Sequence, residues 1–260
     1  MLKLDKPLKQ CRILVTNDDG INAPGLKVLE KIAKELSDDV WVVAPELNQS
    51  GSAHSLTLRS PLRLREVSPR RYAVDGTPTD CVLLAVNHLL RDARPDLVLS
   101  GVNRGANMAE DVTYSGTIAA AMEGTLLGLP SIALSQAIAF QKPPHWSAAE
   151  EHGPDIVARL LAEGWPEGVL MNVNFPNASA RKVQGVKLTR QAQRKIGSAV
   201  QEGKDPYGVP YFWVGLIKTE EEAKQGTDLE AVAEGYISVT PIRLDLTDKS
   251  TLTALKKALG

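Results

Sequence analysis

Five short apolar runs alternate with segments of helical periodicity through the first two thirds of the chain. Each run is rich in β-branched and aliphatic residues, as is typical of strands in a parallel sheet that helices cover on both faces. The alternation predicts an α/β fold: a Rossmann-like, doubly wound, mostly parallel sheet in a three-layer arrangement. The predicted strands are residues 13–16, 40–44, 97–100, 131–135 and 169–175.

Helix signals fill the intervals between these runs. Apolar residues at helical spacing follow Pro24, and the capping-box sequence Thr77-Pro78-Thr79-Asp80 opens the next helix. The predicted elements are helices over residues 24–36, 77–90, 118–127 and 146–163, and a small antiparallel excursion over residues 56–67 and 72–74.

The alternation stops after the fifth strand. Strands predicted over residues 183–188, 211–217 and 236–243 have few helices between them, so this region is expected to form β-hairpins that extend from the core. Projecting hairpins commonly pair with a second subunit. We therefore expect an α/β core over residues 1–180 and, within the same domain, a C-terminal hairpin region for oligomerisation over residues 181–260.

The charge balance argues against a nucleic-acid partner. The 260 residues carry a formal net charge of −1, whereas proteins that bind polyanions present a strongly basic surface.

No apolar stretch has transmembrane length and the N-terminus lacks the apolar segment of a signal peptide, which predicts a cytoplasmic protein without a membrane partner. The two cysteines, Cys11 and Cys81, lie in apolar contexts and are expected to be buried free thiols.

The first predicted strand ends abruptly in Asn17-Asp18-Asp19-Gly20. Ligands of open α/β sheets bind beyond the carboxyl ends of the strands, where these carboxylates would lie. Neighbouring residues of a strand point to opposite faces, so both carboxylates can serve one site only if the chain turns, which Gly20 favours. Two like charges this close raise each other's pKa unless a cation compensates. The sequence suggests a metal site at Asp18 and Asp19; the alternative is a polar turn in which Asp caps the following helix.

Two further strand ends supply polar side chains. The loop after the second strand contains Ser50, and the segment after the third strand contains Asn103 and Asn107. In a parallel sheet these strand ends share one rim. Asp, Ser and Asn offer oxygen ligands only, which suits Mg²⁺ or Mn²⁺ and disfavours a thiolate zinc site. Each residue alone is more often a turn or cap residue, but together they favour a metal.

Ser115-Gly116-Thr117 opens the Ala-rich helix, whose first turn carries no acidic residue. Free backbone N–H groups and the helix dipole would bind an anion there, and a phosphate that bridges this helix start and the metal would account for both features. Plain N-capping by Ser115 or Thr117 is the alternative, and the two roles are compatible. His54 lies in the loop of Ser50, where an exposed loop position is a commoner role than a place in the site.

Several short motifs occur in order along nearly the whole chain. They are Thr16-Asn17-Asp18-Asp19-Gly20, Ala23-Pro24-Gly25, Val43-Ala44-Pro45, Gln49-Ser50-Gly51, residues 76–81, Ser100-Gly101-Val102-Asn103, residues 114–124, Gly226-Thr227-Asp228 and residues 235–241. Together these motifs resemble, with high specificity, the family of the stationary-phase survival protein SurE.

The resemblance implies a metal-dependent phosphatase that hydrolyses nucleoside 5′- and 3′-monophosphates to nucleoside and phosphate; some members of the family also trim short polyphosphate. It implies one divalent ion per subunit, of the Mg²⁺ or Mn²⁺ class. It also implies a homodimer or homotetramer in which C-terminal hairpin elements are exchanged between subunits. The family's metal ligands fall on Asp18, Asp19, Ser50 and Asn103, and its phosphate-contacting positions fall on Asn107, Ser115, Gly116 and Thr117.

Our mechanistic hypothesis is hydrolysis by a metal-activated water, with Asp18 or Asp19 orienting that water as well as binding the ion. Backbone donors at residues 115–117 would hold the developing charge. The rival enzyme mechanism is that of the aspartyl-phosphate phosphatases, in which a strand-end carboxylate is the nucleophile. Those enzymes need Asp-x-Asp after the first strand, whereas here the two carboxylates are adjacent.

Two alternatives are not phosphatases. A signalling receiver domain also places an acidic pair after its first strand, but it needs a phospho-accepting Asp at the end of the third strand, and residues 97–101 contain none. A non-catalytic, metal-dependent nucleotide-binding module is harder to separate by chemistry. The chain has neither a Gly-x-x-x-x-Gly-Lys-Ser/Thr motif nor a Gly-x-Gly-x-x-Gly motif after the first strand.

Overall fold

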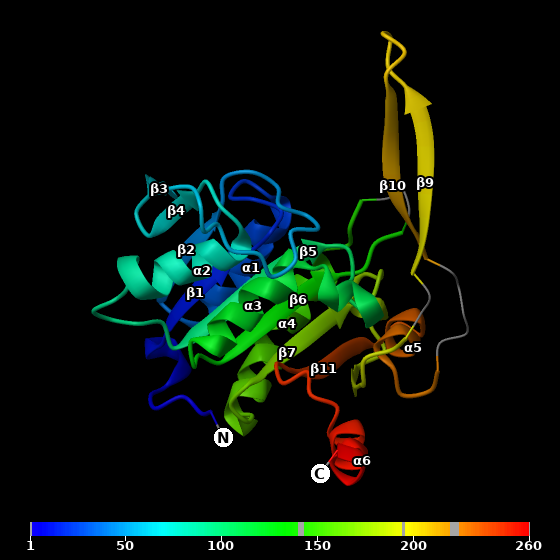
Figure 1. Ribbon diagram of the computed structural model, residues 1–260. Helices are drawn as coiled ribbons and strands as arrows, with labels where there is room; N and C mark the ends of the chain where they lie inside the picture. The colour runs from blue at the N-terminus through cyan, green and yellow to red at the C-terminus, as the bar shows by residue number, and fades with distance from the viewer. Residues whose placement is uncertain (1, 140–142, 194–195, 219–223, 260) are drawn as a thin grey trace.

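Nine strands form one sheet in the computed structural model, which describes residues 2–139, 143–193, 196–218 and 224–259 (Figure 1). In chain order these strands are β1 (Arg12–Thr16), β2 (Asp39–Pro45), β3 (Leu64–Ser68), β4 (Arg71–Val74), β5 (Leu97–Arg104), β6 (Ser131–Gln136), β7 (Val169–Phe175), β8 (Val186–Leu188) and β11 (Ile237–Arg243).

The strand order across the sheet is β3-β4-β2-β1-β5-β6-β7-β11-β8. All pairs from β4 to β7 are parallel, and so is the pair of β11 with β8. The exceptions are β3 against β4 and β11 against β7, which are antiparallel. The mostly parallel α/β sheet predicted from the sequence is therefore confirmed. Because β8 and β11 belong to this sheet, the part of the chain after residue 180 helps to build it.

Helices cover both faces of the sheet (Figure 1). The four that do so are α1 (Pro24–Leu36), α2 (Pro78–Leu84), α3 (Gly116–Leu126) and α4 (Ser147–Glu163). Successive side chains of β1 point to opposite faces. Ile13 and Val15 belong to the apolar core that α1 and α4 cover, whereas Leu14 packs in a second core with Val82 of α2 and Ala120 of α3. The β1 strand is thus buried on both faces, as its uninterrupted apolar sequence predicted.

The β5 strand is longer than its sequence predicted. We expected a loop from Gly101 onward, but the strand continues to Arg104. This expectation was wrong because β6 continues alongside: after a register shift beyond Ser100, Asn103 pairs with Ser135. Asn103 is therefore held by the sheet itself at the end of β5.

The second predicted helix divides into two segments. Its N-terminal capping box is confirmed, since Asp80 N donates to Thr77 Oγ1 at 3.2 Å and Thr77 N donates to Asp80 Oδ2 at 2.9 Å. The α-helical part ends at Leu84 and a π-helical turn, Ala85–Leu89, follows. In the predicted antiparallel excursion, residues 56–63 are not strand and pairing begins only at Leu64.

A two-stranded hairpin projects from the body of the molecule (Figure 1). Its strands are β9 (Ile196–Lys204) and β10 (Pro210–Lys218). The predicted hairpin extension is therefore present, although β9, with its glycines and charged residues, was not predicted as a strand. Two helices of this region were also not predicted, α5 (Asp228–Ala233) and α6 (Lys249–Leu259); α6 lies away from the sheet.

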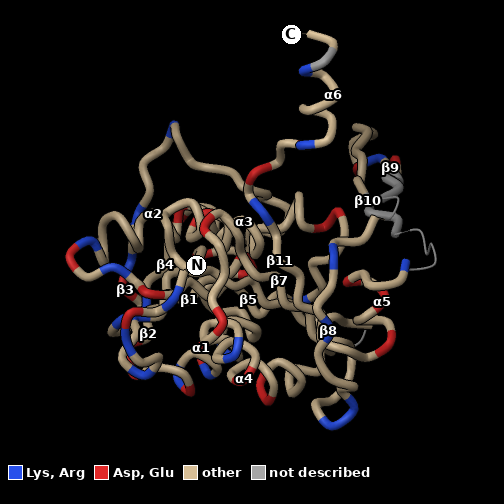
Figure 2. The backbone as a smooth tube through the Cα atoms, turned by 90° about the horizontal axis from the view of Figure 1, so that it is seen from below, with Lys and Arg blue, Asp and Glu red and all other residues tan. Residues whose placement is uncertain are grey.

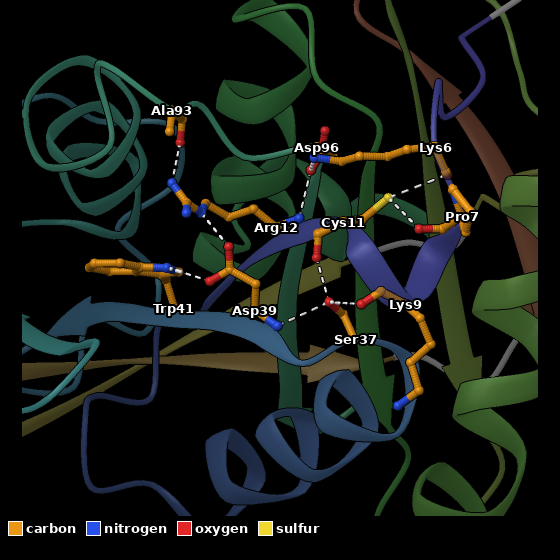
Figure 3. Close-up of polar contacts among 10 residues, drawn as sticks. All are labelled: Lys6, Pro7, Lys9, Cys11, Arg12, Ser37, Asp39, Trp41, Ala93 and Asp96. Carbon is orange, nitrogen blue, oxygen red and sulfur yellow. Dashed lines mark hydrogen bonds and ion pairs between the residues drawn. The ribbon is translucent and has the colours of Figure 1, made fainter.

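The N-terminal segment is fastened to the amino ends of β1 and β5 (Figure 3). Arg12 N donates to Asp96 Oδ2 at 2.6 Å, and the Lys6 ammonium lies 2.8 Å from the same oxygen. The Arg12 guanidinium also donates to Asp39 Oδ2 at 2.7 Å, which links β1 to β2. On the other side of β1, the Ser37 hydroxyl donates to the carbonyl oxygen of Cys11. The residues before β1 are thus part of the fold.

Charged residues of both signs are interspersed around the periphery of the molecule (Figure 2). Cys11 and Cys81 are buried free thiols, as predicted. Within the part of the chain that the structure describes, no helix is both long and apolar enough to cross a membrane.

Replacing Gly25 by Ala should destabilise the fold. Gly25 lies at the start of α1, where an added Cβ would overlap the carbonyl oxygen of Val102 in β5. Backbone atoms cannot swing aside as a side-chain end can, so we expect the free energy of unfolding in urea to fall by roughly 1 to 3 kcal/mol. Lys27→Ala, on the exposed side of the same helix, is the control and should change it little. Equal stability of wild type and Gly25→Ala would contradict this packing.

Candidate active site

The carboxyl ends of β1 and β5, the loop after β2 and the start of α3 surround one pocket of about 200 Å³. This is the rim at which ligands of parallel α/β sheets bind. The residues that line it include Asp18, Asp19, Ser50, Asn103, Asn107 and Ser115. The structure thus brings together six of the eight residues that the sequence nominated.

Asn17 fixes the acidic turn after β1. Its side chain donates to the carbonyl oxygen of Gly20 at 3.0 Å and accepts from Gly20 N at 3.3 Å. The carbonyl oxygen of Asp18 accepts from Gln49 N at 2.8 Å, which draws the Ser50 loop to the same turn. The turn therefore places two carboxylates and the Ser50 loop at one site.

Asp18 is almost completely buried, with 4% of its surface exposed. The Thr117 hydroxyl donates to Asp18 Oδ1 at 2.6 Å. Burial raises the pKa of Asp18 to about 6; the Thr117 hydrogen bond opposes the rise and the charge of Asp19 adds to it. Burial also raises the pKa of Asp19. The backbone N–H of Arg104, which donates to Asp19 Oδ2 at 3.2 Å, opposes this rise. A cation in the pocket would stabilise the charged form of both carboxylates and so lower their pKa.

Gly116 and Thr117 lie against Asp18 and do not line the pocket. A Cβ at Gly116 would lie 2.7 Å from Asp18 Cβ, so only glycine allows the first turn of α3 to approach this closely. The backbone N–H of Thr117 also lowers the pKa of Asp18. The anion that the start of α3 stabilises is thus, in part, the carboxylate of Asp18 itself.

Ser115 caps α3 and also lines the pocket. Its Oγ accepts from Ile118 N at 3.1 Å, which is the N-cap interaction considered from the sequence. A serine hydroxyl that accepts one hydrogen bond keeps its own proton to donate. Ser115 therefore combines the structural role with a donor at the pocket.

The pocket offers a cation oxygen ligands of mixed kind. Asn103 Nδ2 donates to the carbonyl oxygen of Gly105 at 2.9 Å, which orients the side-chain amide and leaves its oxygen for a ligand. Together with Asp18, Asp19 and the Ser50 hydroxyl, this set fits a hard divalent ion. Among the described residues no group of three or more His, Cys, Asp and Glu has metal-site spacing, although a third carboxylate, Asp111, also lines the pocket.

Several site residues were missed by sequence reasoning. Arg104 and Tyr114 line the pocket next to predicted residues. Asn172 and Asn174, both fully buried in β7, contact the peptide of Asn107. The sequence did contain a sign of these two residues: their amides, at alternate positions, interrupt an otherwise apolar strand that is buried on both faces, where an unpaired polar group is costly. His54, by contrast, does not line this pocket: its Nε2 lies 3.0 Å from Glu123 Oε2 on α3.

Comparison with known proteins decides the family. The family model described as "Survival protein SurE" matches residues 13–198. The chain belongs to the SurE family. The resemblance inferred from the motifs is therefore confirmed, and the match covers every residue nominated for the site.

Relatives of similar length agree with this assignment. The chain is 60% identical over 247 residues to "5′-nucleotidase SurE" of Paramagnetospirillum magneticum, covering 95% of each chain. It is 59% identical over 255 residues to the protein of the same name from Parvibaculum lavamentivorans, covering 97% of this chain and 92% of that one. The crystal structure of the SurE protein from Aquifex aeolicus is similar with a TM-score of 0.83 at 43% identity, over 96% of this chain and 100% of that chain.

Asp18→Asn should stabilise the metal-free protein in a pH-dependent manner. The pKa of Asp18 rises from 3.8 to about 6 on folding, so the protonated form favours the fold, and stability is lost as the pH rises through this window. Asn keeps an oxygen that accepts from Thr117 but carries no charge. With chelator present, the variant should exceed wild type by roughly 1 to 3 kcal/mol at about pH 8 and match it at about pH 4.

Thermal unfolding of both proteins in EDTA, followed by circular dichroism, measures this difference. A stability difference that is independent of pH would contradict the assignment of a destabilised carboxylate to Asp18.

Proposed function

We propose that the chain is a 5′-nucleotidase, a phosphomonoesterase that hydrolyses nucleoside 5′- and 3′-monophosphates and short polyphosphate. The observation that carries the proposal is the pocket itself, in which two carboxylates, a hydroxyl and an amide lie beside the start of α3. Relatives of nearly the same length that are 59–60% identical bear the name 5′-nucleotidase SurE, which supports the same activity.

The residues Asp18, Asp19, Ser50 and Asn103 are proposed to hold one divalent ion per subunit, of the Mg²⁺ or Mn²⁺ class. Their all-oxygen chemistry and the raised pKa of both carboxylates support a cation at this place. When bound, such an ion supplies Lewis-acid chemistry, because it lowers the pKa of a water and offsets charge on a phosphoryl oxygen.

The side chains around the pocket are proposed to have different roles in the reaction. Asp18 is buried and held by Thr117, so it serves as a fixed ligand. Asp19 is only half-buried; its Oδ2 accepts from Arg104 N, which leaves Oδ1 to orient the attacking water and take its proton. The Ser115 hydroxyl and the Asn107 amide are proposed to contact the phosphate. The Arg104 guanidinium at the pocket attracts the anionic substrate.

Two rival functions make different predictions. In an aspartyl-phosphate phosphatase a carboxylate would attack phosphorus, so a covalent phosphoenzyme would accumulate in rapidly quenched reactions. A non-catalytic nucleotide-binding module would bind nucleotide with metal and release no phosphate. We favour hydrolysis by water because the two carboxylates are adjacent and lack the Asp-x-Asp spacing, and because Asp18 Oδ1 already accepts a hydrogen bond from Thr117.

The C-terminal region, residues 181–260, is proposed to mediate homodimer or homotetramer formation, in addition to supplying β8 and β11 to the sheet of the nucleotidase core, residues 1–180. The hairpin exposes Tyr211, Phe212, Trp213 and Val214, a run that is apolar and extends from the body. Exposed apolar surface of this kind marks interaction sites. We also propose a cytoplasmic location, in keeping with the two free thiols.

Phosphate release from a panel of nucleoside monophosphates tests the activity directly. The EDTA-treated protein should release little phosphate, and added Mn²⁺ or Mg²⁺ should restore release by at least about a hundredfold, since the ion offsets charge in the transition state. Release that chelator does not change would contradict the metal-dependent mechanism.

Asp19→Asn should lower kcat by about a hundredfold or more, because it removes both a ligand and the group that takes the water proton. The fold should survive, with a thermal midpoint close to that of wild type. Asp92→Asn, the same change at a carboxylate with 92% side-chain exposure, is the control and should keep full activity. Full activity of Asp19→Asn would refute the role given to this residue.

Trp213→Lys should shift the oligomer toward monomer in sedimentation velocity. Trp213 is 70% exposed on β10, and a charge there would oppose burial against a second subunit. Leu58→Lys, at a position that is 83% exposed outside the hairpin, should leave the assembly unchanged. An unaltered sedimentation coefficient for Trp213→Lys would exclude this part of the hairpin from the interface.

A further inference from the structure

The β7 strand carries two asparagines, Asn172 and Asn174, whose side chains are completely buried. They lie two residues apart on one strand and so point to the same face of the sheet. A buried amide destabilises a fold unless its donors and acceptors are paired. Apart from one contact with each other, both bind the peptide of Asn107, a pocket residue.

Both asparagines bind the backbone of Asn107. Asn107 N donates to Asn174 Oδ1 at 2.8 Å, and the carbonyl oxygen of Asn107 accepts from Asn172 Nδ2 at 2.8 Å and from Asn174 Nδ2 at 3.2 Å. Asn174 Nδ2 also lies 3.2 Å from Asn172 Oδ1. Because each donor faces an acceptor, the orientation of both amides is determined by the network.

The side chain of Asn107 is held as well. Its Nδ2 donates to Ser135 Oγ at 2.8 Å. Ser135 is fully buried in β6, in register with Asn103 of β5 on one side and with Asn174 of β7 on the other. A row of polar residues thus runs across three strands from the proposed metal ligand Asn103 to Asn174.

We infer that Asn174 and Asn172 are positioning residues that set the place of Asn107 in the pocket and thereby the affinity for phosphate. The inference rests on the proposed function, in which Asn107 contacts the phosphate. Asn107 follows the end of β5, and among the described residues no backbone group pairs with its peptide. The two asparagines supply the missing partners from β7, so the loop is ordered before substrate arrives.

Neighbouring Ser238 offers a matched control for burial alone. It lies opposite Asn174 on β11 and is also fully buried, but its hydroxyl has no hydrogen-bond partner among the described residues. The contacts therefore predict a graded series. Asn174→Leu removes both the acceptor and a donor for the Asn107 peptide, Asn172→Leu removes one donor, and Ser238→Ala removes nothing.

Calorimetric titration of the Mn²⁺-loaded variants with inorganic phosphate tests the inference. We expect phosphate affinity to fall by at least about tenfold in Asn174→Leu, by about threefold in Asn172→Leu and not at all in Ser238→Ala. KM for a nucleoside monophosphate should rise in the same order. Affinity for Mn²⁺ alone should stay within about twofold of wild type, because the side chains of Asn172 and Asn174 bond to Asn107 and to each other and to none of the four proposed ligands.

The possible results distinguish the proposed nucleotidase function from the positioning role of Asn172 and Asn174. Wild-type protein that binds phosphate without hydrolysing nucleotides would contradict the proposed function and leave this inference standing. Equal phosphate affinity in all folded variants would overturn the inference, as would parallel losses of phosphate and Mn²⁺ affinity, which indicate general damage. If Asn174→Leu does not fold, Asn172→Leu against Ser238→Ala decides the question alone.

Discussion

The burial of Asp18 against the first turn of α3 is the contact on which the rest of the site depends. The Thr117 hydroxyl donates to its carboxylate at 2.6 Å, and Gly116 leaves room for the approach. Together they fix the end of β1 relative to α3, and so place the acidic turn beside Ser115. The same burial raises the pKa of Asp18 to about 6, so the pocket holds a carboxylate whose charge a bound cation would stabilise.

A site of this kind must be held by the fold before any ligand binds. The Asn17 side chain fixes the turn, β6 extends β5 as far as Asn103, and the β7 asparagines hold the peptide of Asn107. These supports come from four adjacent strands of one sheet. Rigid elements hold donors and ligands more accurately than loops do, which is what phosphoryl transfer by positioned groups requires.

Much of this arrangement was predictable from the sequence, for a physical reason. The carboxyl ends of parallel strands meet at one edge, so a correct strand assignment is enough to bring Asp18, Asp19, Ser50 and Asn103 together. The chain does place all four around one pocket. The fold was predictable as well, because the apolar runs are short and rich in β-branched residues, which is typical of doubly buried strands and separates them from longer helices.

The rest could not be predicted because it depends on packing between distant segments. Periodicity marks residues 169–175 as a strand, but only the folded chain shows that Asn174 meets a peptide 67 residues earlier. Likewise, the sequence does not show whether the donors of Thr117 bind a ligand or a neighbouring carboxylate. In the folded chain the close approach at Gly116 brings Thr117 to Asp18, and its hydroxyl donates to that carboxylate. Gly101 was expected to end β5, yet the continuing β6 ladder carries the strand past it.

The most direct measurement of the central claim is anomalous diffraction from crystals of the protein grown with Mn²⁺ and inorganic phosphate. The account predicts one Mn²⁺ peak per subunit, bounded by Asp18, Asp19, Ser50 and Asn103, with phosphate in contact with Ser115 and Asn107. A Mn²⁺ peak elsewhere in the molecule, with this pocket occupied by water alone, would contradict it.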